Sequence, residues 1–544
     1  MSTIRLTGNL VDIPNRSIRP SEVTITDGHI TAIVETSGPV KGYLMPGFID
    51  AHVHVESSML IPSEFARLAV VHGTVATISD PHEIANVLGV AGVDYMIQNG
   101  NQVPFHFFFG APSCVPATQF ETAGARIDAR EVGELLERPE ILYLSEMMNF
   151  PGVLNGDPEV LEKIAHAKRA GKPVDGHAPG LRGDLAARYI QAGMSTDHEC
   201  FTAEEALDKL RHGMWVQIRE GSAAKNFAAL HLLLHDHSHR MMLCSDDKHP
   251  DSLVAGHLNS VCARAVASGI DVFKVLQAAC LNPIDHYKLP VGRLRVGDPA
   301  DLILVEDLEH FRVLRTFIKG RPVAEVGKTL IERVAATTPN NFNCLPKRPS
   351  DFRVEASGTD VLAIEPFDGQ LITRKVHVAA KVEGTEFVAD PSRDLLKIAV
   401  VNRYNEAPVA MGWITKIGLK RGAIASCVAH DSHNIVAVGT NDIDLCAAVN
   451  EIVKNRGGIS LADGDRRMVL PLPVAGIMSD ADAYEVANAY SAIDHAAKEL
   501  GSTMGAPFMT LSFMALLVIP HLKMSDLGLF DGDTFAFVNA PVRG

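Results

Sequence analysis

Two histidines separated by one residue, His52 and His54, end an apolar run at residues 43–54 that contains a Pro-Gly pair. Along a β-strand, residues i and i+2 project from the same face, so both imidazoles can reach one metal ion. The residues that follow, 56–58, are polar. We therefore expect the pair where a buried strand opens onto a loop, a position typical of a catalytic site.

Other side chains that could do chemistry also stand at the ends of short apolar runs. His82 and Glu83 follow one such run, in the segment Asp-Pro-His-Glu, and are candidates for moving protons. The candidate metal ligands number six: His52, His54, Glu146, His177, His198 and Asp246.

Four imidazoles and two carboxylates suffice to hold two divalent ions a few ångströms apart. This donor set suits Zn²⁺, Mn²⁺ or Fe²⁺, and the order of affinities does not choose among them. Between two such ions the pKa of water falls toward neutrality, so hydroxide is available near pH 7. An aspartate at the last strand, Asp246, can bind one ion and accept the proton of that water. The set predicts hydrolytic attack on a carbon bonded to nitrogen or oxygen.

The elements that must position these residues alternate between apolar runs and helix-period segments. Eight runs read as strands: the run ending at His54, and residues 73–80, 106–110, 141–146, 173–178, 195–199, 214–220 and 241–246. Segments with helical periodicity lie between them, such as 158–170, 183–192 and 203–212. This alternation predicts a parallel (β/α)₈ barrel over residues 46–285, an α/β fold in which the carboxyl ends of the strands carry the active site.

The segments that flank the barrel have strand and turn character. Residues 1–45 and 286–340 are expected to pair with each other as a small β-sandwich domain. The proline-containing segment 340–350 resembles a linker, and residues 351–544 are expected to form a C-terminal α+β domain.

The bulk properties exclude several classes of protein. A net charge of −15 argues against nucleic acid as a partner, because phosphate binding needs a basic surface. The eight cysteines are scattered without a C-x-x-C pair, which favours reduced thiols and a cytoplasmic location. The N-terminus lacks the apolar region of a signal peptide. The apolar segment 508–520 is too short to span a membrane and is expected to be a buried strand or helix.

The motifs resemble the amidohydrolase superfamily of metallo-dependent hydrolases, and within it the bacterial adenine deaminase family. The superfamily resemblance rests on PGFIDAHVH and on GRLRVGDPADLILVE at residues 292–306. The narrower resemblance rests on longer segments spread over essentially the whole chain: HVHVESSML, SDPHEIANVLG, DGHAPGLRG, STDHECF, CSDDKHPDSL and HDSHNIVAVGTND.

The resemblance implies hydrolysis of adenine to hypoxanthine and ammonia, a purine salvage reaction, at two Mn²⁺ or Fe²⁺ ions, with Zn²⁺ possible. In this family His52 and His54 are the first-strand ligands, and Glu146 bridges the ions where many relatives have a carboxylated lysine. By the same resemblance His177 and His198 are ligands of the fifth and sixth strands. The resemblance also implies that Asp246 is both a ligand and the base. A hydroxide shared by the metals would attack C6 of the purine, and His82 or Glu83 would protonate a ring nitrogen.

Some roles remain open between two alternatives. His82 and Glu83 either act on the substrate or support a metal-binding histidine. His430 and His433 either contact the purine over the barrel mouth or stabilise a turn in the C-terminal domain. Asp247 orients substrate or caps the following helix.

Three other functions compete with deamination of adenine. Deamination of another aminopurine or a pterin would use the same centre. A cyclic amidase would be expected to carry a lysine where this chain has Glu146. A scaffold without activity would have lost ligands, whereas every expected position is filled. A small-molecule purine is the expected partner, with no membrane partner, and the size and β appendage predict a homodimer or larger homo-oligomer.

Overall fold

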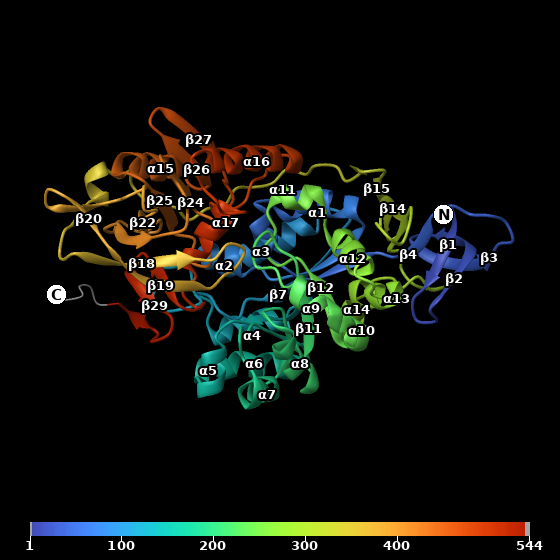
Figure 1. Cartoon of the computed structure of the whole chain (residues 1–544). Coiled ribbons are helices and arrows are strands. Elements are labelled where there is room, and N and C mark those ends of the chain that lie inside the picture. The colour runs from blue at the N-terminus through green and yellow to red at the C-terminus, as the bar shows by residue number, and fades with distance from the viewer. Residues whose placement is uncertain (1–2, 539–544) are drawn as a thin grey trace.

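A (β/α)₈ barrel forms the centre of the computed structural model, which describes residues 3–538 (Figure 1). Its parallel strands are β5 (Phe48–Val53), β6 (Thr74–Ser79), β7 (His106–Ala111), β8 (Ile141–Met147), β9 (Val174–Gly176), β10 (Met194–Asp197), β11 (Trp215–Arg219) and β12 (Met241–Cys244). The backbone of Asp246 closes the barrel, because its N–H donates to the carbonyl of His52 and its carbonyl accepts from the N–H of His54. The barrel predicted from the sequence is confirmed.

Helices connect the strands and cover the outside of the barrel. The main ones are α1 (Pro62–Ala69), α2 (His82–Leu88), α3 (Val90–Gly100), α4 (Ala129–Glu137), α6 (Pro158–Ala170), α7 (Gly183–Gln191), α8 (Ala203–Arg211) and α12 (Leu258–Ala267). Helix α6 shows how the local sequence determines where a helix begins and ends. Asp157 accepts hydrogen bonds from two N–H groups of its first turn, Pro158 opens it, and Gly171 ends it in the left-handed region. Its buried face, which includes Val160 and Ile164, packs against the barrel.

The two segments that flank the barrel share one eight-stranded sheet. Its order is β16 (Lys328–Thr329), β15 (Arg321–Glu325), β14 (Val313–Ile318), β13 (Leu302–Val305), β4 (Tyr43–Pro46), β1 (Thr3–Asp12), β2 (Ser17–Thr26) and β3 (His29–Glu35). Strands β13 and β4 join the segments, with Leu304 opposite Leu44. The domain bounds 1–45 with 286–340, 46–285 and 351–544 stay a prediction.

The C-terminal region contains a second eight-stranded sheet, at the other end of the molecule from the first (Figure 1). Its order is β19 (Thr373–Ala379), β18 (Asp360–Pro366), β23 (Ala410–Ile414), β22 (Leu396–Val401), β25 (Ile435–Gly439), β24 (Ala423–Ser426), β26 (Ile459–Asp463) and β27 (Arg466–Leu470). The accompanying helices are α15 (Asp442–Asn455), α16 (Ala483–Glu499) and the buried α17 (Pro507–Ser512). None of the helices within residues 3–538 is long and apolar enough to cross a lipid bilayer.

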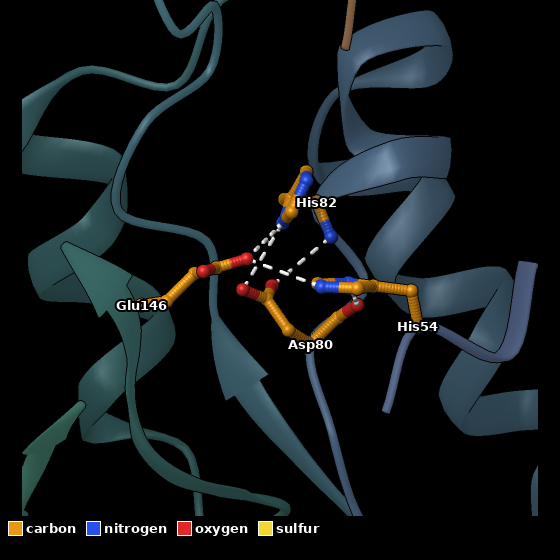
Figure 2. Close-up of side chains that lie close together, drawn as sticks. All are labelled: His54, Asp80, His82 and Glu146. Atoms are coloured by element: carbon orange, nitrogen blue, oxygen red, sulfur yellow. Dashed lines mark hydrogen bonds and ion pairs between the residues drawn. The ribbon is translucent and has the colours of Figure 1, made fainter. Parts of the chain in front are cut away.

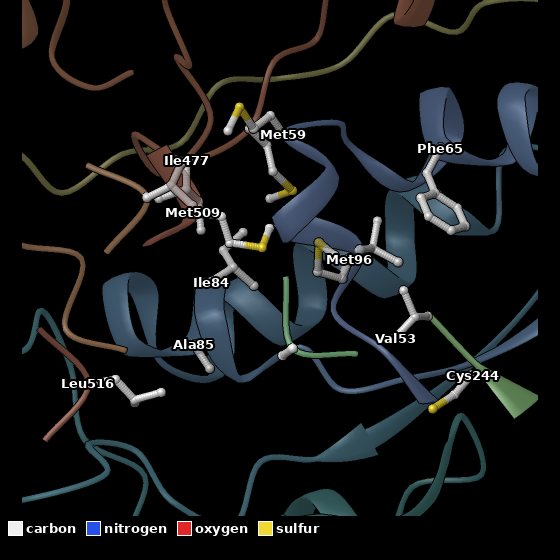
Figure 3. Close-up of a cluster of buried hydrophobic side chains, with 14 of the residues drawn as sticks. Val53, Met59, Phe65, Ile84, Ala85, Met96, Cys244, Ile477, Met509 and Leu516 are labelled. Carbon is white, nitrogen blue, oxygen red and sulfur yellow. The ribbon is translucent and has the colours of Figure 1, made fainter. Parts of the chain in front are cut away.

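The C-terminal region is bonded directly to the barrel. The N–H of Ser479 donates to the carbonyl of Met59 at 2.8 Å, and Arg67 forms ion pairs with Glu64 at 2.6 Å and Asp482 at 2.7 Å. Apolar side chains of both regions meet in one buried cluster (Figure 3). These contacts hold the C-terminal region against the carboxyl end of the barrel, where the candidate ligands lie.

Candidate active site

Three candidate ligands converge where strand β5 meets the end of strand β12. Nε2 of His52 and Nε2 of His54 are 3.2 Å apart. Oδ1 of Asp246 lies 3.4 Å from the first and 3.2 Å from the second. All three side chains are buried. The alternation of strand β5 therefore aims both imidazoles at one point, as the spacing predicted.

Glu146, near the end of strand β8, stands between two pairs of histidines. Its Oε1 is 3.1 Å from Nε2 of His54 and 3.9 Å from Nε2 of His52. Its Oε2 is 2.6 Å from Nδ1 of His177 and 3.3 Å from Nε2 of His198. Burial alone would raise the pKa of Glu146, but the facing imidazoles, His177 first, hold it well below its ordinary value. One carboxylate thus offers one oxygen to each pair.

A buried arginine at the end of strand β11 fixes the orientation of Asp246. Nη1 of Arg219 donates to Oδ2 of Asp246 at 2.8 Å, and Nη2 donates to Oε2 of Glu199 at 3.1 Å. Oε1 of Glu199 in turn lies 3.5 Å from Nε2 of His198. Although burial works in the opposite direction, Arg219 holds the pKa of Asp246 well below its usual range. The guanidinium occupies Oδ2 and leaves Oδ1 to face the histidines.

A second polar group adjoins the first at the end of strand β6. Figure 2 shows His54, Asp80, His82 and Glu146 pointing toward one another. Nδ1 of His82 lies 3.1 Å from Oδ2 of Asp80 and 3.6 Å from Oε1 of Glu146. Burial lowers the pKa of His82, but Asp80 and Glu83 outweigh it and raise that pKa well above the ordinary value. His82 is therefore placed to hold a proton beside the ligand cluster.

Glu83 links the barrel to the C-terminal region. Nδ1 of His430 lies within hydrogen-bond distance of its Oε1, and Nε2 of His433 is 2.5 Å from its Oε2. Nε2 of His82 is 3.4 Å from the same Oε1. The charges of His430 and His433 hold the pKa of Glu83 well below its usual value against the effect of burial. Nδ1 of His433 also accepts a hydrogen bond from the N–H of Ala429 at 3.3 Å and lies 3.2 Å from the carbonyl oxygen of Cys427, so His433 both stabilises its own turn and reaches the barrel mouth.

These groups line a cavity at the barrel mouth. The barrel contributes polar side chains to it, including His54, Glu146 and Asp246. The C-terminal region contributes His430 and Asp431 together with an apolar wall. That wall consists of Leu371, Phe513 and Leu516. The cavity thus combines convergent polar groups with apolar surface, as binding sites for small molecules do.

The donor set fits divalent metal ions. The separations of 3.2 to 3.4 Å among His52, His54 and Asp246 match the roughly 3.3 Å expected between ligands about 2.0 Å from one tetrahedral ion. His52, Glu146 and His198 form a second such group, with donor atoms within 4.8 Å of one another. Nε2 of His177 is buried without a hydrogen-bond partner among the described residues, so it is free to bind a ligand. Imidazole and carboxylate together suit Zn²⁺, Mn²⁺ and Fe²⁺.

The structure brings together all the residues proposed from the sequence and adds charged residues that sequence reasoning missed. Asp80, Glu199 and Arg219 are each buried within this polar network. Asp80 and Glu199 are adjacent or nearly adjacent to nominated histidines, and Arg219 is the last residue of a barrel strand. Arg219 could have been predicted from its position, because it lies near the carboxyl end of the apolar run 214–220. No sequence pattern distinguishes the apolar side chains that line the cavity.

Two family models match this chain. One, described as the amidohydrolase family, matches residues 43–323, which contain the barrel strands. The other, described as the adenine deaminase C-terminal domain, matches residues 370–536.

Similar curated proteins cover the chain from end to end. An adenine deaminase of Salinibacter ruber is 54% identical over 540 residues, which cover 99% of each chain. An adenine deaminase of a Sulfurovum species is 53% identical and also covers 99% of each chain. An adenine deaminase of Methanosarcina barkeri is 49% identical over 98% of each chain.

Proposed function

The chain belongs to the adenine deaminases of the amidohydrolase family, and from this premise we propose which residues perform the deamination of adenine to hypoxanthine and ammonia. The observation that carries the assignment is the position of Glu146. Its two oxygens face two separate histidine pairs, His52 with His54 and His177 with His198. A carboxylate so placed suits a centre of two metal ions.

We propose that six residues hold two divalent ions: His52, His54, Glu146, His177, His198 and Asp246. When bound, the ions would lower the pKa of water toward neutrality and so make hydroxide available near pH 7. Mn²⁺ or Fe²⁺ is the proposed occupant, with Zn²⁺ as an alternative, since all three accept imidazole and carboxylate ligands.

Asp246 is the proposed base. Its Oδ1 faces the cluster while Arg219 retains Oδ2, so a single oxygen is oriented to take a proton from the attacking water. The proton must then pass to the amine that leaves from C6. Asp246 and Glu146 both line the cavity, so this transfer needs no group outside it.

His82 and Glu83 are proposed to protonate the purine ring as negative charge accumulates on it. Both line the cavity, and Nε2 of His82 is 3.4 Å from Oε1 of Glu83. His430 lies within hydrogen-bond distance of Glu83 and can return a proton to it. His433 fixes the other oxygen of Glu83. We therefore assign substrate contact to His82, Glu83 and His430, and orientation of Glu83 to His433.

A role in purine salvage follows from the product, a free base that can be reused. A cytoplasmic location is proposed because all eight cysteines are free and buried. A homodimer or larger assembly remains the proposed oligomeric state.

The assignment can be tested on protein freed of metal and reconstituted with Mn²⁺ or Fe²⁺. Ammonia and hypoxanthine should form from adenine, while guanine should yield no ammonia and the hydantoin ring should stay closed. Asp246→Asn should abolish turnover and retain most of the metal. Near-normal activity of this variant would contradict the role of Asp246, and ring opening of hydantoin to N-carbamoylglycine would favour a cyclic amidase.

A further inference from the structure

Two segments of the C-terminal region form a roof over the cavity, which we define as Leu371, Phe513 and Leu516. Leu371 lies in the connection between strands β18 and β19, and Phe513 begins the short helix Phe513–Ala515. The ring of Phe513 stacks on the imidazole of His430, with 5.1 Å between centroids and 26° between planes. The roof is thus in contact with a proposed substrate-binding residue.

Lys523, on strand β28 (Leu522–Ser525), forms hydrogen bonds with both segments of the roof. Its Nζ donates to the carbonyl of Leu371 at 2.6 Å and to the carbonyl of Phe513 at 2.9 Å. The side chain is fully buried. A single amine therefore holds together two backbone segments that are distant in the sequence.

Burial of this amine away from water is energetically unfavourable. Desolvation lowers the pKa of Lys523 to about 7, with no compensating carboxylate among the described residues. An apolar side chain of similar length would avoid that cost but would leave the carbonyl of Leu371 without this donor and the carbonyl of Phe513 with only the N–H of Leu516. The contribution of the lysine is therefore the link between the two segments.

The position of the roof indicates what this link controls. The roof and the polar groups line the same cavity, and the ring of Phe513 stacks on His430, which in turn contacts Glu83. A base that reaches the polar groups must therefore lie beneath the roof. A sugar attached to the base would need the roof to move.

We propose that Lys523 is a positioning residue that fixes the roof so that the site accepts a free aminopurine base and rejects purines substituted at N9. This inference rests on the proposed function, in that it places adenine in this cavity. Lys523 is not among the residues that line the cavity. Its removal is therefore expected to change binding and selectivity more than the chemical step.

The test is Lys523→Met, which keeps the length of the side chain and removes its donors. We expect KM for adenine to rise about tenfold, kcat to change by less than about threefold, and metal content to stay as in the wild type. Selectivity is measured as kcat/KM for adenine divided by kcat/KM for 9-methyladenine, and it should fall about tenfold or more. Lys523→Gln, which retains two N–H donors, should restore part of the selectivity.

Lys172→Met is the matched control. Nζ of Lys172 also donates to two carbonyls, of Leu136 at 2.6 Å and Arg138 at 2.8 Å, but at the end of helix α4, and neither residue lines the cavity. This variant should lower the unfolding temperature without changing KM or selectivity. If Lys523→Met behaves in the same way, Lys523 is only structural and the proposal is wrong.

Leu516→Ala covers the case in which Lys523→Met does not fold, because it opens the roof directly. It should also lower the preference for adenine over 9-methyladenine. Unchanged selectivity in a folded Leu516→Ala protein would overturn the role of the roof. Failure of the proposed function would look different, because the wild-type protein would then release no ammonia from adenine.

Discussion

Glu83 of the barrel and His433 of the C-terminal region lie 2.5 Å apart, measured from Oε2 to Nε2. His430 approaches the other oxygen of the same carboxylate. The C-terminal region therefore supplies part of the polar lining of the site and does more than cover it. A barrel without that region would leave the carboxylate of Glu83 exposed to water and free to rotate.

Glu83→Gln is expected to lower kcat by about 100-fold, the lower end of the effect of general acid–base catalysis. The amide cannot carry the proton that Glu83 exchanges with His82 and His430. Metal content should be unchanged, because Glu83 is not among the proposed ligands. Steady-state kinetics and metal analysis check both points, with Glu134→Gln, an exposed partner of Arg130, as the control. A kcat within threefold of wild type would rule out this role.

Arg219→Met should lower both metal content and activity. It leaves the buried carboxylates of Glu199 and Asp246 without their cation, and breaking a buried ion pair costs about 3–5 kcal/mol. Asp246 is then free to turn Oδ2 toward the histidines. Metal analysis and thermal unfolding measure the two effects.

The control for that variant is Arg264→Met, because Arg264 pairs with Glu220 but is half exposed. Its loss should change neither metal content nor kcat, since exposed ion pairs contribute about 0–1 kcal/mol. Full metal occupancy in Arg219→Met would show that Asp246 does not depend on Arg219 for its orientation.

The barrel was predictable because its strands are apolar runs with polar residues at their carboxyl ends. The His52 and His54 pair illustrates this, since one strand with alternating side chains fixes both ligands. The spacing of such runs along the chain is a local property that the sequence displays directly.

The roof was not predictable in the same way. Leu371 and Phe513 are ordinary apolar residues, and only tertiary packing brings them over the barrel mouth. Lys523 likewise has no sequence pattern that distinguishes it from a surface lysine. Arg219 was predictable only in part. Its position at a strand end can be inferred from the sequence, but its pairing with Asp246 depends on how the barrel closes.

Metal removal should destabilise the protein as well as inactivate it. Binding to the folded state alone raises stability by RT ln(1 + [L]/Kd), about 2.7 kcal/mol at a hundredfold excess over Kd. A chelator should therefore lower the unfolding temperature, and Mn²⁺ or Fe²⁺ should restore both it and the activity. Restoration of the unfolding temperature should require two equivalents of metal. Saturation at one equivalent would contradict a centre of two ions.

A buried acid near the cavity should affect stability in a pH-dependent way. Burial raises the pKa of Glu121 to about 8 from an ordinary value of 4.5, with the charge of Asp431 adding to the effect. Its Oε1 accepts a hydrogen bond from Thr118 at 3.0 Å. Glu121 is therefore protonated in the folded protein at pH values where it would be ionised in the unfolded chain.

Glu121→Gln should remove this pH dependence. Between pH 4.5 and about 8 the folded state holds one proton more than the unfolded state at Glu121, so its contribution to stability falls as pH rises, by up to about 1.4 kcal/mol per unit. The glutamine cannot ionise and keeps a constant contribution. The unfolding temperature of the variant should therefore rise relative to that of the wild type as the pH increases from 5 to 8. A temperature difference that stays constant across this range would mean that Glu121 titrates normally in the folded protein.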